Sequence, residues 1–137
     1  MSKPRSDVLL FRRAATQRFE DGEWLLASGR TTGAVYLAGY SVECELKALV
    51  LSILPEHKRK QILKLFVGAK AHDFDWLLRL YDEHGGPQVP WEIQQEFVNI
   101  NSWSTDLRYQ PRMTPRSHAE DFFEATTTIL EWAEGRL

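Results

Sequence analysis

The chain has 137 residues, of which 43% are hydrophobic and 12% aromatic, so it holds enough apolar material for one sizeable core. Its formal net charge of -2 excludes an overall attraction to nucleic acid or to an anionic membrane, and any such contact would need a local patch. The one cysteine, Cys44, has no internal disulfide partner, which suits a reducing compartment. We expect a single domain over residues 1–137, located in the cytoplasm.

Neither a signal peptide nor a membrane span is expected. The first apolar run, VLLF at residues 8–11, is too short for a signal-peptide core. The long apolar stretch at residues 34–54 is interrupted by Glu43, Glu45 and Lys47, which a membrane-spanning helix would not place at its middle.

Apolar residues at spacings of three and four predict helices from the beginning of the chain. Residues 6 to about 28 form an amphipathic pattern that ends near Gly29. Residues 34–54 carry two apolar stripes, so this helix has two faces to bury and should be the central element. Pro55 ends it.

Two further helices are expected in the middle of the chain. Residues 56–67 form a short basic pattern. A second pattern follows in KAHDFDWLLRLYDEHGG, where His72 or Asp73 can cap the helix start, and Gly85 and Gly86 end the helix.

The last part of the chain predicts two helices separated by a proline-containing loop. Pro90 suits the first turn of a helix that runs to about Trp103. Ser117 and Glu120 have the spacing of a capping box, so the last helix should start close to His118. Without any alternating strand pattern, the fold class is all-α, an up-and-down bundle of four main helices plus a short extra helix.

The stretch AVYLAGYSVECELKALVL is similar to the signature helix of HEPN domains (higher eukaryotes and prokaryotes nucleotide-binding). The matching positions are Tyr36, Ala38, Gly39, Tyr40, Glu43, Leu46, Lys47 and Ala48. Further matching residues follow in the family's order: His72, Asp73, Trp103, Arg108 and Tyr109. The resemblance spans about residues 8 to 134 and implies an up-and-down helical bundle that usually forms a homodimer.

A polar stripe crosses the central helix. Glu43 and Lys47 are four residues apart, which favours an ion pair, and Tyr36 and Tyr40 extend the same face. An unpaired buried charge costs about 3 to 5 kcal/mol, so we expect Arg108 to supply a second cation to Glu43. The resulting cluster either fixes the helix packing or the dimer seam, or it lines a nucleotide or RNA cleft.

The resemblance also implies a possible catalytic pair. Catalytic HEPN proteins are metal-independent ribonucleases with an Arg, four to six residues and then a His. Here RMTPRSH places Arg112 and His118 at that spacing, although Met113 stands where the family has a polar residue and Pro115 lies inside the interval. His118 would move the 2′-hydroxyl proton and Arg112 would offset charge on the phosphate.

No metal or cofactor site is predicted. His72, Asp73 and Asp75 lie close together in the sequence, but their spacing matches no known ligand set. Gly-rich phosphate loops and nucleophile elbows have no counterpart in the chain.

Three functions remain open. The first is a non-catalytic, dimeric HEPN-like module that binds a nucleotide, RNA or a minimal nucleotidyltransferase partner, as in toxin–antitoxin or defence systems. The second is a metal-independent endoribonuclease that uses Arg112 and His118, with the basic residues 57–64 as a phosphate contact. The third is a helical interaction protein whose surface does no chemistry.

Overall fold

The computed structural model describes residues 6–137, and residues 1–5 of the predicted domain lie outside the described part. The described residues form helices joined by loops, without a β-strand, so the predicted all-α class is confirmed. Its elements are α1 (Ser6–Ala27), α2 (Thr31–Ser52), α3 (Glu56–Leu65), η1 (Ala69–His72), α4 (Phe74–Glu83), α5 (Trp91–Asn99), η2 (Thr105–Tyr109) and α6 (Arg116–Glu134), where η1 and η2 are short 3-10 helices.

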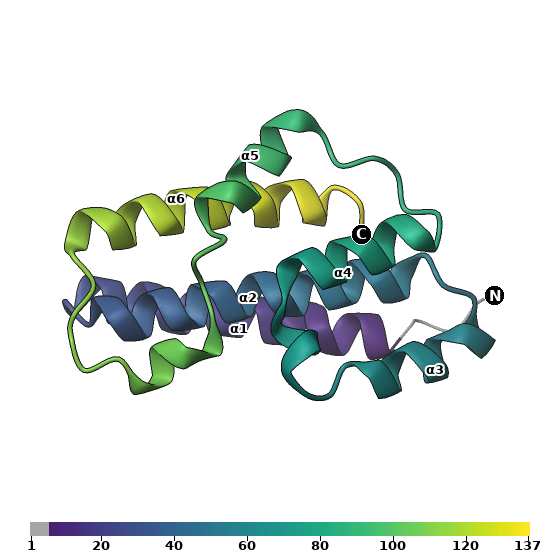
Figure 1. The fold of residues 1–137 in the computed structure, drawn as a ribbon, viewed down its shortest axis with the longest axis horizontal. Helices are drawn as coiled ribbons and strands as arrows, with labels where there is room; N and C mark the ends of the chain where they lie inside the picture. The colour runs from purple at the N-terminus through teal and green to yellow at the C-terminus, as the bar shows by residue number, and fades with distance from the viewer. Residues whose placement is uncertain (1–5) are drawn as a thin grey trace.

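Helix α2 is the centre of the bundle, as its two apolar stripes predict. It contacts α1, α4, α6 and η2, and every residue in the range 41–51 is buried. Figure 1 shows α1, α2 and α6 lying lengthwise, with α5 over α6 at one edge and with α3, η1 and η2 along the opposite edge. None of the helices in residues 6–137 has both the length and the apolar character that crossing a bilayer requires.

The ends of α4 follow the predicted signals. Oδ1 of Asp73 accepts hydrogen bonds from the backbone N–H groups of Asp75 at 2.9 Å and Trp76 at 3.3 Å, so Asp73 is the cap. After the helix, Gly85 has a φ of +89°, which side-chain-bearing residues rarely adopt.

The start of α6 differs from the prediction. The helix begins at Arg116, with Pro115 at the N-cap and no side-chain cap. Because Pro115 is already in an extended conformation that leads into the helix, Ser117 falls inside the first turn, where its hydroxyl cannot cap. Glu120 instead accepts a hydrogen bond from Nε of Arg116 at 2.9 Å.

A close contact fixes the segment before η2 on α2. The indole Nε1 of Trp103 donates to the carbonyl of Tyr36 at 3.2 Å. A β-carbon on Gly39 would lie 2.1 Å from that nitrogen, so only glycine leaves room for the indole at this position. Trp103 also stacks on Phe74, with ring centres 5.1 Å apart, and thereby joins α2, α4 and the chain that leads into η2.

Candidate functional site

Glu43 lies in the middle of α2 with 0% of its surface exposed, and both of its oxygens are paired. Nζ of Lys47 donates to Oε2 at 2.7 Å, which is the ion pair that the spacing predicts. Nδ1 of His72 lies 2.8 Å from Oε1. Since a carboxylate can only accept, Nδ1 carries the proton of this contact, and a neutral His72 presents Nε2 as an acceptor.

The lysine of this pair is itself buried, and its ammonium group makes cation–π contacts with two aromatic rings. Its ammonium lies 5.4 Å from the ring centre of Phe66 and 5.9 Å from that of Phe11. Cation–π contacts are stronger when the cation is shielded from water. The pair therefore joins α2 to α1 and to the end of α3, in addition to neutralising Glu43.

Arg108 is not the second cation of the cluster, and that expectation is wrong. Its side chain is exposed, Nε donates to the carbonyl of Thr105 at 3.0 Å, and the guanidinium lies 5.3 Å from the ring centre of Tyr109. The tight turn of η2 keeps Arg108 on its own element, while η1 brings His72 to Glu43 instead.

Sequence reasoning assigned His72 and Asp73 to the same role, but the structure separates them. Asp73 caps α4, whereas His72 closes η1 and pairs with Glu43, which is 29 residues earlier in the chain. The available signal was an acidic residue on the buried stripe of α2, with one oxygen beyond its pair with Lys47 still to be satisfied, together with a histidine just before a helix start. Spacing alone could not join the two.

Aromatic rings and a cation form one surface beside this cluster. The ring centres of Tyr36 and Tyr40 are 5.9 Å apart, and those of Tyr40 and His72 are 6.3 Å apart. Burial, and after it the negative charge of Glu43, raises the pKa of Tyr40, while the nearby Arg108 acts in the opposite direction. Tyr109 completes the group, with 75% of its surface exposed. We call these five residues (Tyr36, Tyr40, His72, Arg108 and Tyr109) the aromatic surface.

Glu45, the remaining charge of α2, belongs to a different contact. It faces the seam with α1 and α6, where it lines a small cavity with Glu134. Burial, followed by the charge of Glu134 and a hydrogen bond to it, raises the pKa of Glu45 to about 8, while Arg12 acts in the opposite direction. Arg12 is paired with Glu134 at 2.6 Å. A protonated Glu45 can donate to Glu134 and so share one negative charge with it.

The loop that carries Arg112 is fastened to the first turn of α2. Oγ1 of Thr32 donates to the carbonyl of Arg112 at 2.8 Å and accepts from the backbone N–H of Thr114 at 2.8 Å. The side chains of Arg112 and His118 are both exposed. His118 stands in the first turn of α6, so the loop and the helix start hold the two residues at the same end of the bundle.

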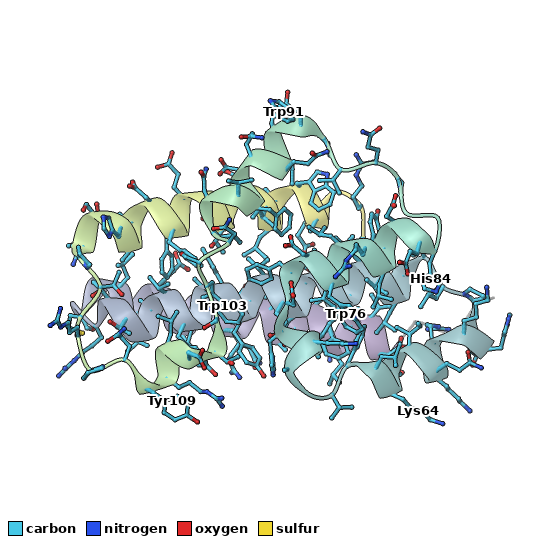
Figure 2. The ribbon with its side chains drawn as sticks, viewed as in Figure 1. Lys64, Trp76, His84, Trp91, Trp103 and Tyr109 are labelled. Atoms are coloured by element: carbon cyan, nitrogen blue, oxygen red, sulfur yellow. The ribbon has the colours of Figure 1, made fainter. Side chains whose placement is uncertain are left out.

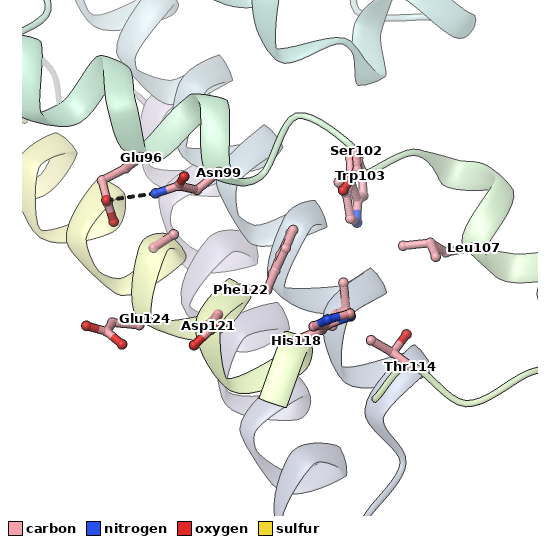
Figure 3. A pocket seen from close by; sticks show the side chains of 12 residues that line it. Glu96, Asn99, Ser102, Trp103, Leu107, Thr114, His118, Asp121, Phe122 and Glu124 are labelled. Carbon is pink, nitrogen blue, oxygen red and sulfur yellow. Dashed lines mark hydrogen bonds between the residues drawn. The ribbon is translucent and has the colours of Figure 1, made fainter. Parts of the chain in front are cut away.

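His118 lines a cavity of about 640 Å³ between α5, η2 and α6, whereas Arg112 is not part of its lining. Figure 3 shows His118 near Thr114 and Phe122, with three carboxylates, those of Glu96, Asp121 and Glu124, around the same hollow. Negative charges at this distance oppose a phosphate group. Within one chain, the structure therefore does not bring Arg112 and His118 into one electropositive site.

The basic residues of α3 are mostly solvated. Arg59 is paired with Asp7 at 3.0 Å, while the side chains of Lys58, Lys60 and Lys64 are exposed. Figure 2 shows Lys64 and Tyr109 along the same edge of the molecule. Helix α3 thus adds positive charge to the edge on which Tyr109 lies.

No group of three or more His, Cys, Asp or Glu residues within 6–137 is arranged to hold a metal ion.

Comparison with known proteins gives one match, to a domain family. Neither a curated protein nor a solved structure gives a significant match to the chain. The HEPN domain family matches residues 8–136, which include α2 with its Glu43 cluster and both 3-10 helices. With nearly its whole length covered, the chain belongs to the HEPN domain family.

Proposed function

We propose that this chain is a HEPN module that binds single-stranded RNA or nucleotides on the aromatic surface. The observation that carries the proposal is the exposed ring of Tyr109 with the guanidinium of Arg108 over it, next to the row of Tyr36, Tyr40 and His72. Unpaired bases stack on aromatic rings and on guanidinium planes, and this is the common mode of single-strand recognition.

The charges along this edge support the same ligand. Arg108 stands on η2 and Lys70 on η1, the element that carries His72, and the side chains of Lys58, Lys60 and Lys64 on α3 are exposed as well. Basic side chains that follow a backbone supply the salt-dependent part of RNA binding. In contrast, the larger cavity around His118 carries carboxylates, so it is the less favourable surface for a phosphate chain.

The test is fluorescence anisotropy with a labelled single-stranded oligoribonucleotide. Replacing Tyr109 by alanine should weaken binding about 5- to 150-fold, since one base–aromatic stack contributes about 1 to 3 kcal/mol. Arg108→Gln should weaken binding and lower the slope of log K against log salt by about 0.7, as one phosphate contact is lost.

Trp91→Ala is the matched control. Trp91 is a similarly exposed ring, 67% exposed against 75% for Tyr109, on α5 at the opposite edge of the molecule. The Trp91→Ala variant should bind RNA as tightly as the unchanged protein does. Equal losses in the Tyr109 and Trp91 variants, or no binding by the unchanged protein, would contradict the proposal.

A second candidate is a metal-independent endoribonuclease with Arg112 and His118. The spacing of the two residues and the threonine contacts that fix their loop favour it. A second chain would have to bring a cation toward His118, because the single-chain cavity is acidic. EDTA-resistant cleavage of RNA that is lost in both Arg112→Ala and His118→Ala would establish this activity.

The remaining parts of the proposal concern assembly. We expect the module to act as a cytoplasmic homodimer and to have a minimal nucleotidyltransferase as its partner, as in toxin–antitoxin or defence systems. Light scattering of the purified chain tests the dimer. Co-purification with a nucleotidyltransferase expressed from the same operon tests the partner.

A further inference from the structure

A cavity of about 340 Å³ adjoins His72, between η1, the first turn of α4, the segment after α5 and the start of η2. Phe74, Phe97 and Trp103 give it apolar walls, and Phe74 and Trp103 are stacked with only 13° between their planes. Its volume is at the lower end of the roughly 300 to 1,000 Å³ that ligand pockets occupy. It suits one flat ring system rather than an extended ligand.

The polar groups of this cavity are mainly hydrogen-bond acceptors. His72 has its Nδ1 proton committed to Glu43, so its free Nε2 accepts when the ring is neutral. The carboxyl group of Asp75 has no hydrogen bond or ion pair to another described residue. Asp73 uses Oδ1 for the two backbone N–H groups of α4 and keeps Oδ2 available.

Hydroxyl and amide groups complete the lining, in which hydrogen-bond acceptors still predominate. Ser104 accepts the backbone N–H of Asp106 at 3.1 Å, and Thr105 and Asn101 stand beside it. A ligand in this cavity therefore meets two carboxylates and an imidazole acceptor. To form hydrogen bonds with them, it has to supply N–H donors. A base edge of carbonyl acceptors would be repelled.

We propose that this cavity is a base pocket that selects guanine, which deepens the proposed function and rests on it. Guanine presents N1–H and N2–H₂ side by side, and a carboxylate can accept from both. Adenine and cytosine present one amino group next to a ring acceptor. Uracil has its one N–H between two carbonyls, so the expected order is guanine, then adenine and cytosine, then uracil.

The pocket is continuous with the aromatic surface. His72 belongs to both, and Trp103, which forms a cavity wall, also stacks on Tyr36 with ring centres 6.2 Å apart. Arg108 is attached to the wall through its hydrogen bond to the carbonyl of Thr105. A base held in the cavity can thus leave its phosphate at the cation of η2, while neighbouring bases stack outside.

The test uses labelled uridine oligomers that carry one central guanosine, inosine, adenosine, cytidine or uridine. The guanosine oligomer should bind about tenfold more tightly than the inosine oligomer, which lacks only the N2 amino group. The uridine-only oligomer should be the weakest. Because the change is in the ligand, protein folding does not enter this comparison.

Protein variants then show which residue causes the preference for guanosine over inosine. Asp75→Asn should reduce the preference for guanosine over inosine to about twofold. It should not weaken binding of the uridine-only oligomer, because it only removes a negative charge near the RNA backbone. Asp82→Asn, an exposed acid at the other end of α4, is the control and should keep the preference. Melting temperatures of both variants show that α4 is intact.

The outcomes separate the two proposals. If all five oligomers bind equally well, the base pocket is refuted while RNA binding stands. A preference for another base, or a guanosine preference that Asp75→Asn leaves unchanged, also overturns the pocket. If no oligomer binds, both proposals fail.

Discussion

Replacing Glu45 by glutamine should stabilise the protein at alkaline pH and leave its stability unchanged in mild acid. The side chain is 3% exposed, and its Oε1 has no hydrogen-bond donor among the described residues. Glutamine keeps the size of the side chain. Its amide can donate to Glu134 at any pH, as only the protonated form of Glu45 can.

The direction of the pH dependence follows from the protonation states of Glu45 in the folded and the unfolded chain. The pKa of Glu45 rises from an ordinary 4.5 to about 8 in the folded protein, mainly because of burial and then because of Glu134. Between these values the folded chain holds a proton that the unfolded chain has lost. The contribution of Glu45 to the free energy of unfolding therefore falls as the pH rises from 4.5 toward 8, and this contribution is constant below and above that range.

The magnitude is bounded by the size of the shift. A tenfold change in a proton-binding constant corresponds to about 1.4 kcal/mol, so raising the pKa from 4.5 to about 8 sets an upper limit near 5 kcal/mol. Glu45 lines a cavity that is large enough to admit water, which would lower this cost, and we expect about 1 to 3 kcal/mol. For a chain of this length, that corresponds to a rise in Tm of about 3 to 12 °C.

Urea unfolding followed by circular dichroism, at about pH 5 and about pH 9, measures the difference directly. Glu92→Gln, at an exposed position of α5, is the control and should change stability little at either pH. An equal gain for Glu45→Gln at both values of pH would contradict the titration argument. A loss at pH 9 would mean that an ionised Glu45 is stabilised by Arg12, and the reasoning would be wrong.

Two further predictions concern α2. Glu43→Gln leaves the buried ammonium of Lys47 without its counter-charge and should cost about 3 to 5 kcal/mol, measured by urea unfolding; a cost below about 1 kcal/mol, typical of a surface pair, would contradict the buried cluster. Gly39→Ala places a β-carbon 2.1 Å from Nε1 of Trp103 and should destabilise the protein by about 1 to 3 kcal/mol. It should also shift the indole N–H resonance of Trp103 in an NMR spectrum, and an unchanged resonance would refute the contact.

Local patterns predicted the helices because each helix buries a stripe that recurs every three or four residues. The same local logic found the Glu43–Lys47 pair, since its members are one turn apart. It failed where partners are distant in sequence or where a 3-10 helix turns the chain. His72 reaches Glu43 through η1, and Glu134 meets Glu45 from the last helix, and neither contact has a sequence period.

Prolines and short turns account for the remaining differences. Ser117 and Glu120 have the right spacing for a capping box, but Pro115 is the N-cap of α6, so the helix starts two residues too early for it. Arg108 was a reasonable partner for a buried acid, yet η2 turns it toward Thr105 and Tyr109. For the site, the sequence identified the residue types of the aromatic surface but not the cavity, because the lining of the cavity comes from four separate segments.

The two buried glutamates of α2 avoid the cost of an unpaired buried charge in different ways, and this difference bears on function. Glu45 lowers the cost of burial by holding a proton, so its effect is on how the stability of the protein depends on pH. Glu43 has a cation on one oxygen and an imidazole on the other, so its effect extends to the surface through His72. If the base pocket is correct, the buried carboxylate fixes which nitrogen of His72 accepts from the ligand. The buried charge of α2 is thus the part of the core that orients the site.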